Sequence, residues 1–295
     1  AFSKHDSSKL YTYSNHVHLS TDEGHSWETI SPDLTRNDKS KLVSSGGPIT
    51  QDNTGVEYYA TIFAVDESPL QEGLIWVGSD DGLIHLTKDG GATWENVTPK
   101  KMPDWMMINS IDASSFDSGT AYIAGTRYKL GDFTPYLYVT DDYGKNWKLI
   151  TDGIKDEHFT RVLRSDKVNK NILYAGTETG MYISYDRGNS WNEFQKNLPI
   201  VPITDLTIKD NSLIVATQGR SIWMIDDLTV IHQLTSSTDE VKLYKPKDSY
   251  RMRGAGGRKS LTAGTNLPNG VIVHYFIPNY NKENDQVRLS IHSAC

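Results

Sequence analysis

Three carboxylates are the side chains in this sequence that are best suited to chemistry. Asp80 and Asp81 lie in "GSDDGL", and Glu178 lies in "GTETGM". Two carboxylates hydrolyse a glycosidic bond with retention when they are ~5–5.5 Å apart, and with inversion at ~6.5–9.5 Å. Asp80 or Asp81 together with Glu178 is therefore the catalytic pair to test, although the sequence leaves open whether the chain is an enzyme.

Two histidines could contribute to a metal site. His16 and His18 are separated by one residue, which places both imidazoles on the same side of a strand. A zinc site needs a third ligand and often a fourth, and His25 lies on a predicted turn. The sequence also has no Gly-rich phosphate loop, nucleophile elbow or metalloprotease motif. We therefore expect neither a metal nor a cofactor.

The composition argues against some partners. The 295 residues carry a formal net charge of −7, which offers no basic field to offset the repulsion of nucleic acid phosphates. No apolar run approaches the ~20 residues of a membrane span, and no signal peptide is visible in a segment that could derive from a longer chain. The single cysteine, Cys295, allows no internal disulfide, which suits a bacterial secreted or periplasmic protein as well as a cytosolic one. Whether Cys295 is native stays open.

An octet that occurs four times indicates which repeated elements position these residues. It reads "STDEGHSW" at 20–27, "TKDGGATW" at 87–94, "TDDYGKNW" at 140–147 and "SYDRGNSW" at 184–191. The motif aspartates are 67, 53 and 44 residues apart. A propeller blade takes ~40–50 residues, so two intervals are near one unit and the longest is one unit with an insertion.

The segments around the octets repeat as well. Short strand candidates precede each octet, as in "LIWVGSDDGLIHLT" and "LYAGTETGMYIS", and another strand begins at its Trp. A fifth unit ends in "LIVATQGRSIWMIDD", where Asp227 takes the motif position but the Gly and Trp are missing. Meanders of near-equal length are typical of propeller blades. We therefore predict an all-β fold of about five blades, the first one incomplete.

The octet has a structural interpretation. Its Asp can accept backbone N–H groups and hold the turn closed. Its Gly supplies a positive φ, and its Trp can bury a ring between neighbouring sheets. We assign these structural roles to Asp22, Gly24, Trp27, Asp89, Gly91, Trp94, Asp142, Gly144, Trp147, Asp186, Gly188 and Trp191.

The four octets resemble the Asp-box, or BNR, repeats of sialidase-like and sortilin-like β-propellers, over about residues 1 to 230. The stretches "ISPDLTRND" and "ATQGRSIWMIDDLT" are also similar to a bacterial family of large exported proteins described as glycosyl-hydrolase-like. The resemblance implies a secreted, periplasmic or cell-surface protein whose Asp-boxes lie away from the ligand face. It does not establish a reaction. The Phe/Tyr-Arg-Ile-Pro signature of sialidases is absent.

Three regions are expected along the chain. Residues 1–234 form the propeller blades, 235–240 a linker, and 241–295 the start of an Ig-like β-sandwich module that appears truncated, with strands in "GVIVHYFIP" and "DQVRLSIHSAC". The Gly-rich basic segment 251–260 is expected to be a loop. Because the chain starts inside a blade, the remaining blades are expected from a longer chain or from another chain; the total blade number and the oligomeric state stay open.

Propeller geometry places the loops between strands 2 and 3, and the connections from strand 4 to the next strand 1, on one face. Loops on a rigid scaffold are frequent binding sites. Arginine forks suit carboxylates and sugar hydroxyls, and aromatic rings can stack on a sugar. The candidate ligand-binding residues are Glu57, Tyr58, Trp105, Arg127, Tyr128, Glu178 and Arg220.

These observations lead to three hypotheses for function. The first is an exported β-propeller that binds polysaccharide or protein through its loop face. The second is a glycoside hydrolase that acts on polysaccharide, and the third is a sortilin-like receptor for peptides. The identity and spacing of the carboxylates at the centre of the loop face would separate them.

Overall fold

The computed structural model describes residues 1–52, 58–234, 240–250 and 270–292. Glu57, residues 235–239 of the predicted linker, the basic segment 251–260 and Cys295 lie outside these residues. The chain divides into two compact units, Ala1–Ile225 and Asp226–Cys295. Within the described ranges, no helix has the length and apolar character needed to cross a membrane.

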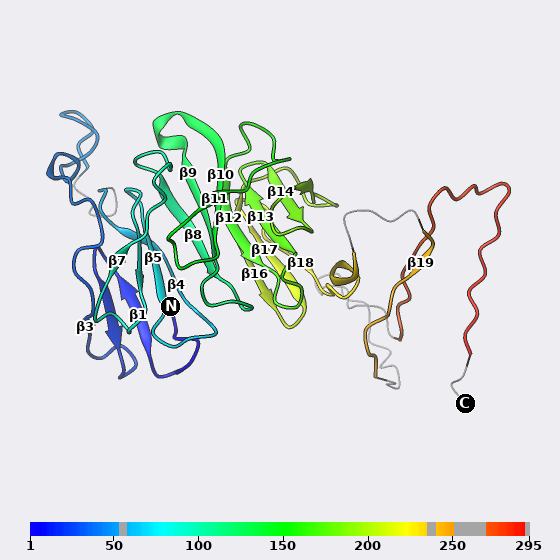
Figure 1. The fold of residues 1–295 in the computed structure, drawn as a ribbon. Helices are drawn as coiled ribbons and strands as arrows, with labels where there is room; N and C mark the ends of the chain where they lie inside the picture. The colour runs from blue at the N-terminus through cyan, green and yellow to red at the C-terminus, as the bar shows by residue number, and fades with distance from the viewer. Residues whose placement is uncertain (53–57, 235–239, 251–269, 293–295) are drawn as a thin grey trace, which may run out of the picture. The chain divides into compact units, whose positions relative to one another are not determined.

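Five antiparallel sheets follow one another along Ala1–Ile225, and in each sheet neighbouring strands are also neighbours in sequence (Figure 1). We number these sheets as blades 1 to 5. Blade 1 contains β1 (Leu10–Tyr13), β2 (Val17–Ser20) and β3 (Glu28–Thr29), and blade 2 contains β4 (Ile62–Glu67), β5 (Ile75–Ser79), β6 (Ile84–Thr87) and β7 (Glu95–Asn96). Blade 3 contains β8 (Met107–Ala113), β9 (Ala121–Arg127), β10 (Asp132–Thr140) and β11 (Lys148–Leu149). Blade 4 contains β12 (Thr160–Ser165), β13 (Leu173–Thr177), β14 (Gly180–Ser184) and β15 (Asn192–Glu193), and blade 5 contains β16 (Ile203–Lys209), β17 (Ser212–Thr217) and β18 (Ile222–Ile225).

The predicted all-β architecture is confirmed, because the described chain has three four-stranded and two three-stranded meanders in this unit and only short 3-10 turns as helices. The turns are η1 (Lys39–Lys41), η3 (Tyr128–Leu130) and, in the second unit, η4 (Ile231–Gln233). Buried aliphatic and aromatic side chains fill the space between successive sheets.

The second unit has one small sheet, in which β19 (Lys242–Leu243) pairs with β20 (Tyr275–Phe276). The segment "GVIVHYFIP" therefore contributes two paired residues. The prediction of a strand in "DQVRLSIHSAC" is wrong for its described part, since residues 285–292 form none. A strand requires a partner for its backbone N–H and C=O groups, and the described residues supply none there. The Ig-like module stays a prediction.

The first strand in each of blades 2 to 5 is the inner one, because β4, β8, β12 and β16 contact one another in succession. Each of these strands has a β-bulge at the same place, between Ile62 and Ala64, Ile108 and Ser110, Thr160 and Val162, and Ile203 and Asp205. A bulge leaves one residue unpaired and re-aims its side chain. The unpaired residues are Phe63, Asn109, Arg161 and Thr204.

Glycines opposite the bulges let the next blade approach closely. Gly176 pairs with Val162, and a Cβ on Gly176 would lie 2.6 Å from Cγ2 of Ile203 in blade 5. A Cβ on Gly78 would lie 2.4 Å from Cγ2 of Ile108 in blade 3. Such distances are shorter than real Cβ contacts, so only glycine fits at these positions of the second strand.

At the opposite, outer side of the sheets, each octet closes the turn before the last strand of its blade, between β2 and β3 in blade 1 and between the third and fourth strands in blades 2 to 4. In blade 2, Thr93 donates to the Asp89 carboxylate from Oγ1 at 2.6 Å and from its backbone N at 2.9 Å. Thr87 Oγ1 donates to Asp89 at 2.8 Å and accepts the N–H of Gly91 at 2.9 Å. Equivalent bonds form in the octets of Asp22, Asp142 and Asp186.

The octet also ties each blade to the one before it. The indole nitrogens of Trp94, Trp147 and Trp191 donate to the backbone oxygens of Ile30, Val97 and Ile150 at 2.9, 2.7 and 2.7 Å. Each acceptor directly follows the last strand of the preceding blade, which is β3, β7 or β11. The octet glycines have φ between 80° and 105°, and the last three leave no room for a Cβ beside the same Ile30, Val97 and Ile150.

Asp89→Ala should lower the melting temperature at neutral pH. It should also reduce the fall in melting temperature that occurs as the pH decreases. Hydrogen bonds from Thr93 lower the pKa of Asp89 from 3.8 to about 2. A carboxylate whose pKa is lower in the folded state stabilises that state above its unfolded pKa, and the stabilisation disappears as the pH falls toward the folded value. Thermal melting curves recorded at intervals between roughly pH 6 and pH 2 should therefore show a smaller decrease in melting temperature with acid for the variant than for the wild-type protein.

The matched control is Asp156→Ala, which removes an exposed aspartate from the connection between blades 3 and 4. It should leave the melting profile unchanged. Equal profiles for the wild-type protein and Asp89→Ala would contradict a stabilising role for the octet carboxylate.

Gly176→Ala should destabilise the protein by ~1–3 kcal/mol, as overpacking typically does. The new methyl group would overlap Ile203 Cγ2 and Val162 Cγ1. Chemical denaturation of the single variants and of the double variant Gly176→Ala/Ile203→Ala measures this, and the combined loss should be less than the sum of the single losses. Additive losses would mean that the two side chains do not compete for the same space.

Candidate functional site

The four bulge residues share one cavity between the inner strands. The cavity has a volume of about 320 Å³, and its wall includes Phe63, Asn109, Arg161 and Thr204, one from each of blades 2 to 5. Blade 1 contributes Tyr13. Because the bulge recurs at the same register, the repeated fold brings side chains from distant parts of the sequence together at one place.

Arg164 in this cavity has a structural role. Its Nη2 pairs with Asp205 at 2.9 Å, and its Nε donates to the backbone oxygen of Leu206 at 2.9 Å. Its Nη1 donates to the oxygen of Leu163 at 2.9 Å. All three nitrogens are therefore engaged, and the side chain joins blade 4 to blade 5.

Arg161 is held in place by protein contacts, and part of its guanidinium group remains available to a ligand. Its Nε donates to Glu178 at 2.6 Å, and its Cζ lies 5.7 Å from the Tyr128 ring centre and 5.4 Å from that of Phe159. The two rings stack on each other at 5.3 Å. Within the described residues, Nη1 and Nη2 of Arg161 have no acceptor. A fixed guanidinium with two available donors is suited to a carboxylate.

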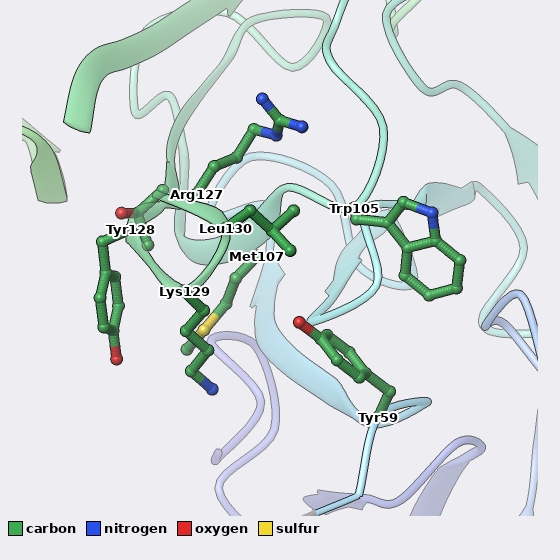
Figure 2. A pocket seen from close by; sticks show the side chains of 8 residues that line it. Tyr59, Trp105, Met107, Arg127, Tyr128, Lys129 and Leu130 are labelled. Atoms are coloured by element: carbon green, nitrogen blue, oxygen red, sulfur yellow. The ribbon is translucent and has the colours of Figure 1, made fainter. Parts of the chain in front are cut away.

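A second cluster lies where the loop between β9 and β10 meets the connections before β4 and β8. Figure 2 shows Tyr59 and Trp105 beside each other, with Arg127 at the end of β9. The Tyr59 and Trp105 rings meet edge to face at 5.6 Å, and the guanidinium carbon of Arg36 lies 5.2 Å from the Trp105 ring centre. Arg127 pairs with Asp132 at 2.6 Å.

This second cluster is packed rather than open. Its cavity measures about 10 Å³, which is room for about one water molecule. Trp105 and Ala60 have φ values of 59° and 72°, a left-handed conformation that is unfavourable for a bulky residue. Such strain persists where surrounding contacts fix the chain, so the ring pair is a well-defined feature of this face.

The three predicted catalytic carboxylates each have protein partners. Asp81 is buried and accepts Ser79 Oγ at 2.6 Å and the backbone N–H of Arg36 at 2.7 Å. Asp80 accepts the N–H of Thr61 at 2.9 Å, and burial raises its pKa. Glu178 pairs with Arg161. Asp81 thus holds the loop, whereas Asp80 is the carboxyl group that is shifted toward its protonated form.

The structure brings some of the predicted ligand-binding residues together and leaves others apart. Trp105, Arg127 and Tyr128 line the small cavity together with Tyr59, whereas Tyr58 is half-buried and is not part of its lining. Arg220 lines neither cavity; it is exposed at the turn between β17 and β18, where its Nη1 donates to the oxygen of Gly219 at 2.9 Å. Glu57 is outside the described residues.

Sequence analysis missed the bulge residues, above all Arg161. The available signal was "TRVLRSD" in an inner strand, where Val162 and Leu163 are buried and the arginines are only partly so. Arg161 faces the inner cavity from this strand, whereas Asp112 on the inner strand β8 is buried and accepts hydrogen bonds from Ser165, so a charge on an inner strand does not by itself indicate the site.

No metal site is formed by the described residues, which contain no group of three or more His, Cys, Asp or Glu side chains that could hold an ion. His16 contacts the backbone oxygen of Ser31 at 3.0 Å, and His18 contacts the hydroxyls of Ser14 and Thr29 at 3.1 Å each. These ring nitrogens therefore make contacts within blade 1.

Comparison with known proteins supports the fold. A family model for sortilin (neurotensin receptor 3) matches residues 135–255. The GH74 xyloglucanase of Xanthomonas campestris is 17% identical with a TM-score of 0.56, over 76% of this chain and 35% of the enzyme. The Cps50 (Swd1) β-propeller domain of Myceliophteria thermophila is 12% identical with a TM-score of 0.53, over 76% of this chain and 63% of that domain.

These structural relatives are distant, so the likeness concerns the fold alone. The chain spans about a third of the xyloglucanase, 35%, and no curated protein sequence matches it. The octets, the antiparallel meanders, the family-model match and the structural matches all indicate the same fold. The chain is therefore an Asp-box repeat β-propeller, similar to the sortilin-like and GH74 propellers.

Proposed function

We propose that this propeller is a binding module that holds a carboxylate-bearing segment of a protein ligand at its inner cavity. The observation that carries the proposal is Arg161, a fixed guanidinium with two donors available to a ligand beside a cavity of about 320 Å³. A carboxylate can accept both donors at once, and such charge-assisted pairs are stronger than neutral hydrogen bonds.

The surroundings of Arg161 favour a protein over a polysaccharide. Phe63 is 48% exposed and Tyr13 is 38% exposed in the same cavity, so an apolar side chain next to the carboxylate would gain contacts there. The rings of Tyr128 and Phe159 stack on each other and carry Arg161, which leaves less of their faces for a sugar. The match to a sortilin model, which includes Arg161 within 135–255, agrees with this choice.

The proposed module acts outside the cytoplasm, at the envelope or cell surface. This location rests on the resemblance to exported Asp-box proteins.

Arg161→Gln should remove a preference for free carboxylates. The probe is a fluorescein-labelled Gly-Ser-Gly-Phe-Leu peptide with either a free carboxylate or an amide at its C-terminus, measured by fluorescence anisotropy. A hydrogen bond to a charged group contributes ~1.5–3 kcal/mol, so the free acid should bind the wild-type protein roughly 10- to 100-fold more tightly than the amide. The variant should bind both peptides equally.

Arg220→Gln is the matched control, since Arg220 lines neither cavity, and it should retain the preference. Equal binding of acid and amide by the wild-type protein would refute the carboxylate role. Tight binding of a neutral xyloglucan oligosaccharide, unaffected by Arg161→Gln, would point to polysaccharide recognition instead.

A glycoside hydrolase is the second candidate, and Asp80 is the observation in its favour. Burial raises the pKa of Asp80, as is required of a general acid that donates its proton to a leaving group. If the chain hydrolyses xyloglucan, Asp80→Asn should reduce the release of reducing sugar by ~10²–10⁴-fold. Asp156→Asn should have no effect, and a wild-type protein without any activity would reject this candidate.

A further inference from the structure

A groove at the outer rim, between blades 2 and 3, plays no part in the function proposed above. Residues 95–101, which include β7, line one side of it, and Tyr138, residues 144–147 and Leu149 of blade 3 line the other. We call this space the outer groove. Its volume is about 620 Å³, larger than the 320 Å³ of the inner cavity, and lies within the ~300–1,000 Å³ that is usual for ligand sites.

Three exposed lysines line the outer groove, and none of them has a carboxylate partner among the described residues. Lys100 and Lys101 follow β7, and Lys145 belongs to the third octet. The carboxylate in the lining, Glu95, lies 3.9 Å from Lys88 and so has a cation of its own. The outer groove therefore has an excess of positive charge, on a chain whose formal net charge is −7.

The equivalent places between other blades carry no such charge. Counted from the oxygen that accepts the octet indole, residues 100–101 correspond to 33–34 after blade 1 and to 153–154 after blade 3. Those pairs are Asp-Leu and Gly-Ile. The position of Lys145 is an alanine in the second octet and an asparagine in the fourth. Blades thus pack on one another without lysines at these places, so the packing of blades does not explain them.

The outer groove is open because the chain after β7 turns away from the next octet. After β11 the connection lies against the octet, where the backbone N–H of Trp191 donates to the oxygen of Asp152 at 2.8 Å, and Trp191 is 4% exposed. After β7 the N–H of Met102 instead donates to the oxygen of Pro99 at 3.0 Å. Trp147 consequently stays half-buried beside the outer groove.

The outer groove also has an apolar part and a free strand edge. Leu149 is 49% exposed and lies near Trp147 in the lining. The N–H of Val97 donates to the oxygen of Ile84 in β6 at 2.8 Å. Because backbone groups alternate in direction along an antiparallel strand, the N–H and C=O of Asn96 point away from β6. In the described part of the chain these two groups have no partner, so an extended segment can pair with them.

We propose that the outer groove binds an acidic, extended segment of a protein partner. Its carboxylates would pair with the three lysines, an aliphatic side chain between them would pack on Leu149, and its backbone would add to β7 at Asn96. Addition of a peptide to a sheet edge is a recurrent mode of recognition. A polysaccharide with uronic acids would also satisfy the lysines, but it has no backbone ladder to offer to Asn96 and no aliphatic side chain for Leu149.

The test uses a fluorescein-labelled Ser-Glu-Leu-Glu-Val-Glu-Ser peptide with an amidated C-terminus, and a neutral control peptide with Gln in place of each Glu. In fluorescence anisotropy only the acidic peptide should bind the wild-type protein, and added salt should weaken it because exposed charges are screened. Lys101→Gln/Lys145→Gln should weaken its binding roughly 3- to 30-fold, since each exposed ion pair contributes modestly. Leu149→Glu, which places a like charge beside the segment, should weaken it as well.

The matched control is Lys170→Gln/Lys209→Gln, which removes two exposed lysines outside the outer groove and gives the same net charge. It should bind the acidic peptide as the wild-type protein does. Equal weakening by both double variants would mean that only the overall charge matters, and would overturn the proposal, as would equal binding of the acidic and neutral peptides.

Two further results would assign the ligand or the site differently. An oligogalacturonate that binds the wild-type protein but not Lys101→Gln/Lys145→Gln, with no binding of the acidic peptide, would identify an acidic polysaccharide as the ligand and overturn the proposal. Loss of acidic-peptide binding in Arg161→Gln would place the peptide at the inner cavity and would also overturn it. Retained binding in Arg161→Gln is the expected result, so the two sites are tested independently.

Discussion

The hydrogen bond from an indole N–H to the end of the preceding blade is the interaction on which the rest of this structure depends. One short segment, the octet, forms the turn, brings its Gly close to the preceding blade and donates this hydrogen bond. The Asp fixes the turn, the Gly allows the neighbouring backbone to come near, and the Trp reaches across. A second close approach at Gly78 and Gly176 sets the spacing at the inner side. The Trp bonds join blades 1 to 4, and the glycine contacts join blade 2 to blade 3 and blade 4 to blade 5.

Fixed spacing explains how a site arises from repeats. The bulge occurs at one register in four inner strands, so its unpaired residue appears at one place in each blade. The backbone is shared, but the side chains are Phe63, Asn109, Arg161 and Thr204. An unpaired residue contributes little to the ladder and can differ between blades without loss of the sheet. The octet residues therefore hold the scaffold together, and the unpaired bulge residues supply the side chains that a ligand would contact.

The sequence predicted the fold better than the site. The octet residues act within a few positions of one another, so their spacing alone indicates a turn and a strand. The bulges have no such local signature, because whether Arg161 is paired depends on a register set by other strands. Glu178 was predicted as an acid or a ligand contact, and its partner Arg161 was missed. Asp81 looked catalytic from its loop, yet its buried bonds to Ser79 and Arg36 are visible only in three dimensions.

The serial arrangement of the Trp bonds has a consequence for cooperativity. Each blade is coupled to its immediate neighbours, as in a repeat protein whose stability is a sum of unit and nearest-neighbour terms. A local opening in one blade then removes support from two others and not from the whole unit. Among the described residues, blades 1 and 4 have this bond on one side and blade 5 has none, so the two ends of the series are expected to open at a lower free energy than blades 2 and 3. Because Arg161 lies in blade 4 and Thr204 lies in blade 5, an opening at that end of the series would also deform the inner cavity.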